Sequence, residues 1–214
     1  MNVTFTGEPS ARQIMVPFHG KCGRTRFARR LPSVTILAHP YWAGHTFDNV
    51  LRHRFDGVEI YNHVCHCFNE KSSGMTYWDA MLSQRPETLG MAVDNAHFWL
   101  SAPVWNGGWI VVNSAELTRL AVLDALRRGN FYASRGPQFH SIRLEDNYVV
   151  LGTSPVRSVR LVGAGSRGRQ WIADPEGDPI TELAAELPDD GSYVRVEIED
   201  EAGKLAWTNS LFVP

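Results

Sequence analysis

Three short apolar segments of the chain each carry, or end in, side chains that bind metals or transfer protons. Residues 34–38 are followed by His39, residues 57–61 contain Glu59, and residues 89–93 are followed by Asp94, Asn95 and His97. Imidazoles and carboxylates are ligands that divalent zinc, manganese and iron accept, and both also serve as general acids or bases. Because no two of these residues have the spacing of a local metal motif, a structural role for each histidine and a shared site both stay open.

The segments that carry these residues have the composition of buried β-strands. They are short, apolar and partly β-branched, and residues 109–112 form a fourth such run. Residues 46–54 and 76–84, which lie between them, have the pattern of helices. Alternating strands and helices predict a parallel sheet or barrel, and the carboxyl ends of its strands would gather the chemical side chains at one edge.

The second half of the chain is predicted to change from α/β to all-β. Asn113 as N-cap, Glu116 at the third helical position and Gly129 after the last turn predict a helix over 114–128. Residues 131–134 then predict a strand. From about residue 140 half-buried strands alternate with turns, at 141–151, 158–162, 193–199 and 205–212. We therefore expect an α/β portion over 1–139 and a β-sandwich-like region over 140–214.

A dense cluster of histidines and cysteines follows the second strand. His63, Cys65, His66 and Cys67 could bind zinc, but ligands separated by one residue or none are closer than the usual spacing of two to four. A loop that carries thiols is the plainer interpretation.

Composition limits the remaining function classes. The chain has 214 residues and a formal net charge of -2, and this charge gives no reason to expect nucleic acid as a partner. Its three cysteines are an odd number, which indicates reduced thiols. No window approaches the roughly 18 apolar residues of a membrane span, and the first eleven residues lack the pattern of a signal peptide. We therefore expect a cytoplasmic protein with no membrane partner.

Four motifs resemble, in order, those of the PHP domain, the polymerase and histidinol phosphatase superfamily. They are residues 36–42 (ILAHPYW), 56–62 (DGVEIYN), 92–97 (AVDNAH) and the stretch from 116 to 137, which ends in FYASRGP. Residues 206–209 (AWTN) are similar to the close of the β appendage in the metal-dependent phosphoesterase branch of that superfamily. The resemblance implies a partial, distorted (β/α) barrel of PHP type with metals at the carboxyl ends of its strands.

The resemblance also implies a set of metal ligands. His39 matches a metal-binding histidine, His97 matches the histidine that ends the aspartate-x-histidine motif, and Glu8 with His19 looks like an earlier glutamate and histidine pair. Glu8, His19 and His39 would then hold one zinc, manganese or iron ion. Glu59 matches an acidic position near the site.

The chain departs from the family pattern at two places. It has no counterpart of the family's opening histidine-x-histidine and threonine-aspartate-histidine motifs. Asn95 stands where the family has a metal-binding aspartate, and a neutral amide oxygen binds a hard cation less strongly and cannot act as a base. Asp94 could substitute only if the backbone turns differently. From these departures we expect a truncated gene product or a diverged relative.

Two functions follow from the sequence. The first is a metal-dependent phosphoesterase in which His97 or Asp94 orients the nucleophile or protonates the leaving oxygen, with Glu59 nearby and Arg135 binding a substrate oxyanion. An exposed turn position is the alternative for Arg135. The second is a catalytically degenerate protein that binds a metal or small ligand, or that pairs with another copy to cover open strand edges.

Overall fold

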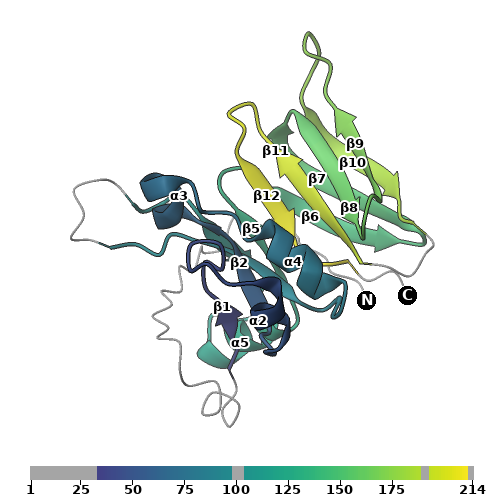
Figure 1. Cartoon of the computed structure of the whole chain (residues 1–214). Helices are drawn as coiled ribbons and strands as arrows, with labels where there is room; N and C mark the ends of the chain where they lie inside the picture. The colour runs from purple at the N-terminus through teal and green to yellow at the C-terminus, as the bar shows by residue number, and fades with distance from the viewer. Residues whose placement is uncertain (1–32, 98–103, 189–192, 212–214) are drawn as a thin grey trace.

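The computed structural model describes residues 33–97, 104–188 and 193–211, and these residues form three β-sheets with four helices (Figure 1). The helices and the parallel sheet of the described residues lie between residues 36 and 127. The remaining sheets are antiparallel, and most of their strands come from the second half (Figure 1). The predicted Glu8 and His19 lie outside the described residues.

The first sheet is parallel and holds the predicted chemical side chains. Its strands lie in the order β1 (Ile36–Leu37), β2 (Gly57–Asn62) and β3 (Leu89–Val93). The connections contain the helices α2 (Phe47–Leu51), α3 (His63–Asn69) and α4 (Met75–Leu82). Since both strand pairs are parallel, the three carboxyl ends face the same edge, as the sequence predicted.

The second sheet joins distant parts of the chain. Its order is β4 (Trp109–Val112), β5 (Phe131–Ser134), β12 (Leu205–Thr208), β11 (Val194–Glu199), β8 (Ser158–Gly163) and β9 (Gly168–Ile172). Every neighbouring pair in it is antiparallel. One sheet therefore unites strands from both sides of residue 139.

The third sheet packs on part of the second to make a sandwich. It consists of β10 (Ile180–Glu186), β7 (Tyr148–Val156) and β6 (Phe139–Glu145), all antiparallel. Its inner residues share one buried cluster with residues of β8 and β11, and examples are Ile142, Leu151, Val159 and Val196. Figure 1 shows these strands as the two facing layers.

The predicted partial (β/α) barrel is wrong. The described residues contain only three parallel strands, and the next strand, β4, pairs antiparallel with β5 instead of extending the parallel sheet. β5 then pairs with β12 from the far end of the chain. Apolar periodicity predicts where strands lie but not which strands pair. A (β/α) barrel requires each new strand to join the sheet in parallel, and the antiparallel pairing of β4 with β5 does not meet this requirement.

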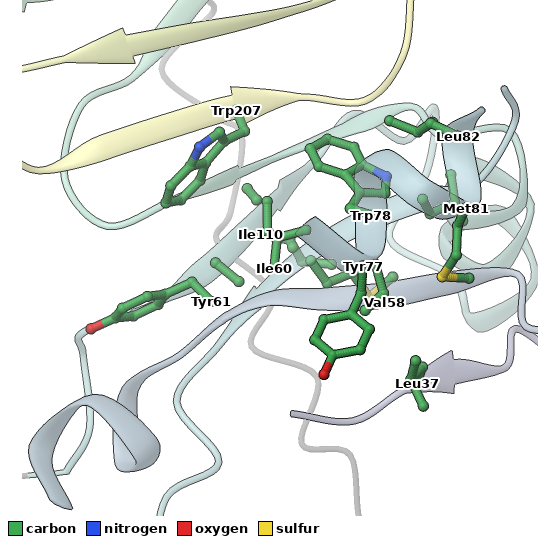
Figure 2. Packing of buried hydrophobic residues seen from close by; sticks show 14 of the residues in the cluster. Leu37, Val58, Ile60, Tyr61, Tyr77, Trp78, Met81, Leu82, Ile110 and Trp207 are labelled. Atoms are coloured by element: carbon green, nitrogen blue, oxygen red, sulfur yellow. The ribbon is translucent and has the colours of Figure 1, made fainter. Parts of the chain in front are cut away.

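A C-terminal strand completes the core around the parallel sheet. Trp78 of α4 is fully buried, and its indole N–H donates to the Thr88 carbonyl at 2.9 Å. Figure 2 shows Trp207 of β12 in the same cluster as Trp78 and Ile60. Burying side chains of this size stabilises the fold by about 2 to 3 kcal/mol each, so the two halves are held by a common core.

The helix α5 (Arg119–Arg127) starts later than predicted. Its N-cap is Thr118, whose hydroxyl accepts the N–H of Ala121 at 3.2 Å, so the cap predicted at Asn113 with Glu116 does not form. The end matches the prediction, because Gly129 has a φ of 72°, which glycine adopts without strain. Leu117 and Leu120 are exposed and give no apolar reason for an earlier start.

Candidate functional site

His39 and Glu59 meet at the carboxyl edge of the parallel sheet. His39 follows β1 with a φ of 28°, and its backbone N–H donates to Oε2 of Glu59 at 2.7 Å. The side-chain amide of Asn62 donates to the same oxygen at 2.9 Å. Nδ1 of His39 is buried and has no hydrogen-bond partner among the described residues. The site therefore contains a strained histidine with one uncompensated buried nitrogen.

The environment of Glu59 favours its protonated form. The residue is 7% exposed, and desolvation by burial raises the pKa of its carboxyl above the ordinary value. Hydrogen bonds from Asn62 and from the backbone of His39, and the charge of His39, oppose that effect. A carboxyl with a raised pKa beside an imidazole is an arrangement that suits acid/base chemistry.

The carboxylate of Asp94 holds a loop. It accepts backbone N–H groups from Asn106 at 2.7 Å, Gly107 at 2.8 Å and Gly108 at 2.9 Å. Asn95, the next residue, has a φ of 51°, a left-handed conformation that asparagine tolerates. Asp94 therefore acts here as an anchor for residues 106–108.

The predicted metal ligands are only partly assembled within the described residues. His97 is half-buried in the segment after β3. The described ranges contain no group of three or more His, Cys, Asp or Glu residues placed to hold a metal ion. His39 and Glu59 are thus the pair that the structure brings together from the predicted set.

Arg135 is placed against an aromatic ring and is only half exposed. Its guanidinium carbon lies 4.1 Å from the centroid of the Tyr61 ring, and its Nε is buried without a partner in the described part of the chain. Burial raises the pKa of Tyr61 to about 12, although the nearby Arg135 works against this, so Tyr61 keeps its hydroxyl proton at neutral pH. The cation is held by a cation–π contact and retains free donor capacity.

The segment predicted as a thiol-bearing loop is the helix α3. Asn62 is its N-cap, and its side-chain oxygen accepts the N–H of Cys65 at 3.0 Å. The helix places His63 and Cys67 on one face, with 3.6 Å between Nε2 and Sγ, and the Tyr61 hydroxyl lies 2.9 Å from Nδ1 of His63. The four-residue spacing from His63 to Cys67 and the capping Asn62 were the sequence signals for this arrangement.

Comparison of the chain with family models, with curated proteins and with solved structures gives no match. Within the described residues, no helix has the length and apolar character that crossing a membrane requires.

Proposed function

We propose that this protein is a metal-dependent phosphoesterase whose site lies at the carboxyl edge of β1, β2 and β3. The four ordered motifs that resemble PHP proteins support the reaction class, although the fold of the described residues is not the barrel which that resemblance implied. The substrate would be a small-molecule or nucleotide-like phosphoester.

The observation that carries the proposal is the buried, unpartnered Nδ1 of His39, a residue whose backbone N–H donates to the carboxyl of Glu59. A buried polar atom without a partner costs about 1 to 3 kcal/mol, and strained backbone adds to that cost. Ligand sites are commonly built at the carboxyl edge of a parallel sheet. A ligand bound to that nitrogen would remove the free-energy cost, which is why we place the site here.

The chemistry of the donors fits a borderline divalent ion. Imidazole nitrogen and carboxylate oxygen are both accepted by zinc, manganese and iron, so His39 would hold the metal together with Glu8 and His19 of the predicted set. A bound ion of this kind lowers the pKa of a water ligand and polarises a phosphoryl oxygen.

The remaining side chains would transfer protons and bind the phosphate group. Glu59 orients His39 through its backbone N–H and exchanges a proton with the substrate or water. Arg135, with its unpartnered Nε, binds a non-bridging phosphate oxygen, for which a guanidinium is well suited. His97 is the second candidate for the proton transfer, and Asp94 keeps the loop 106–108 in place.

The test is metal content and hydrolysis in wild type, His39→Ala and Glu59→Gln. We expect zinc, manganese or iron to co-purify with wild type and to be lost in His39→Ala. Hydrolysis of bis-p-nitrophenyl phosphate should fall by about 10- to 100-fold in Glu59→Gln, which keeps the acceptor oxygen but cannot ionise.

The matched control is His140→Ala, because His140 is exposed on β6 in the sandwich and away from the parallel sheet. It should retain wild-type metal and activity. Folded wild-type protein that is loaded with each of the three metals and hydrolyses no phosphoester would overturn the proposal.

One observation favours a second function, a degenerate protein that binds a metal or ligand without catalysis. The carboxylate of Asp94 accepts three backbone N–H groups of the loop, and Asn95 supplies no charge at the position where the PHP motif has aspartate. In this case His39→Ala would abolish binding, and no variant would change a background rate of hydrolysis.

A further inference from the structure

We propose that Cys67 is a covalent modification site for soft carbon electrophiles, with His63 as its base and Tyr61 as the residue that positions His63. The nucleophile and the base lie on α3, and Tyr61 lies at the end of β2. The proposed step uses none of the residues assigned to phosphoester hydrolysis. It takes electron-poor carbon–carbon double bonds, the class of the Michael acceptors.

The geometry is that of a nucleophile, a base and an orienting group. Sγ of Cys67 lies 3.6 Å from Nε2 of His63, within reach of a hydrogen bond that involves sulfur. Nδ1 of His63 lies 2.9 Å from the Tyr61 hydroxyl. The hydroxyl oxygen can accept the Nδ1 proton, and in that tautomer Nε2 is the nitrogen that accepts from the thiol. A histidine base hydrogen-bonded to the thiol is the usual means by which proteins activate a cysteine nucleophile.

The surroundings of His63 restrict its movement. A side chain added at Gly107 would come within 2.1 Å of its ring, so the loop that Asp94 anchors lies directly against the imidazole. The ring also stacks with His66, with 6.1 Å between centroids. His66 itself pairs with Glu70, at 2.9 Å from Nδ1 to the carboxylate, and does not compete for Cys67.

Exposure separates the two cysteines of this helix. Cys67 is exposed, whereas Cys65 is 1% exposed and faces the core. Burial raises the pKa of Cys65 to about 12, so it is protonated and inaccessible at neutral pH. Cys65 therefore serves as an internal reference within one protein.

The proposed step balances without any oxidant or reductant. The thiol proton moves to Nε2 of His63, and the sulfur adds to the β-carbon of the double bond and forms a carbon–sulfur bond. The π electrons move to the carbonyl side and make an enolate. The enolate takes back the proton from His63, so the product is the saturated thioether and His63 is regenerated.

The experiment measures the rate of adduct formation with N-ethylmaleimide at pH 7, with EDTA present so that metal ions do not mask the thiol. Peptide mapping by mass spectrometry assigns the adduct to each cysteine. We expect Cys67 to react about tenfold faster than free N-acetylcysteine, and Cys65 to stay unmodified.

The variants test the roles of His63 and Tyr61. His63→Gln should reduce the rate at Cys67 to that of the free thiol, and Tyr61→Phe, which keeps the aromatic ring under Arg135, should reduce it several-fold with an unchanged circular dichroism spectrum. Cys67→Ser should remove the adduct mapped to residue 67, and Cys65→Ser should not affect that adduct.

Two results overturn the proposal. One is a wild-type Cys67 that reacts no faster than N-acetylcysteine. The other is a folded Tyr61→Phe protein with the wild-type rate, and this variant decides the question if His63→Gln fails to fold. Neither result bears on phosphoester hydrolysis, which has its own assay.

Discussion

The guanidinium of Arg195 on β11 lies 2.5 Å from the carboxylate of Asp79 on α4, so an ion pair joins the six-stranded sheet to a helix that packs on the parallel sheet. The Arg195 side chain is 3% exposed, lies over the Trp78 ring and also contacts Glu197. The two halves of the chain are thus connected by charge as well as by the common apolar core.

The first prediction concerns this ion pair. Asp79→Asn should lower the free energy of unfolding by about 2 kcal/mol, because a buried guanidinium loses one of two carboxylate partners. Urea denaturation measures the loss. The control is Asp124→Asn on α5, which breaks an exposed pair with the C-cap residue Arg128 and should cost less than about 0.5 kcal/mol. Equal losses in both variants would contradict a special role for the Arg195 contact.

The second prediction is a pH dependence that Glu59 introduces. Burial raises the folded-state pKa of its carboxyl above the ordinary value of 4.5, which applies to the unfolded chain. As the pH rises from that value through the folded pKa, the unfolded chain releases this proton before the folded protein does. The stability that this group contributes is therefore present at lower pH and is lost across that window.

Glu59→Gln cannot ionise and should lack this loss. We expect the variant to become progressively more stable relative to wild type in urea denaturation as the pH rises from 4.5 through the raised pKa of Glu59. Glu201→Gln, in an exposed turn, should show no such trend. A difference between wild type and Glu59→Gln that does not change with pH would refute the expectation.

The third prediction tests the anchor at Asp94. Asp94→Ala should destabilise the protein by about 2 kcal/mol, because three backbone N–H groups lose a charged acceptor. Hydrogen exchange at Gly107 and Gly108 should accelerate, which mass spectrometry of the peptide can record. Asp174→Ala removes a turn carboxylate that accepts the backbone N–H of Glu176 in the sandwich, and should leave exchange at 107 and 108 unchanged.

The fourth prediction concerns Asn95. Aspartate tolerates the left-handed backbone at this position, so Asn95→Asp should fold normally and restore a charged oxygen. If the metal site is intact but weakened, affinity for zinc or manganese in calorimetry should rise by about tenfold. Asn69→Asp adds the same charge at the exposed end of α3 and should have no effect. Unchanged affinity in Asn95→Asp would show that this position takes no part in binding.

The sequence by itself determined where most of the local elements lie. The apolar runs 89–93, 109–112 and 131–134 are strands with the predicted limits, because a buried strand is mostly apolar and each of these runs is followed by a polar residue. Gly129 marked the end of α5 for a similarly local reason, its positive φ. The position of His39 at the end of a strand followed from the same signals.

Only the tertiary structure decided which strands meet and in which direction. The pairing of β5 with β12 joins residues more than seventy positions apart, and no local pattern encodes that contact. The same holds for the candidate sites. The bond from His39 to Glu59 depends on the parallel register of β1 and β2, and the contact of His63 with Cys67 depends on α3 continuing past its Asn62 cap. Side-chain chemistry can be read from a sequence, but distances are set by the packing of elements that are remote along the chain.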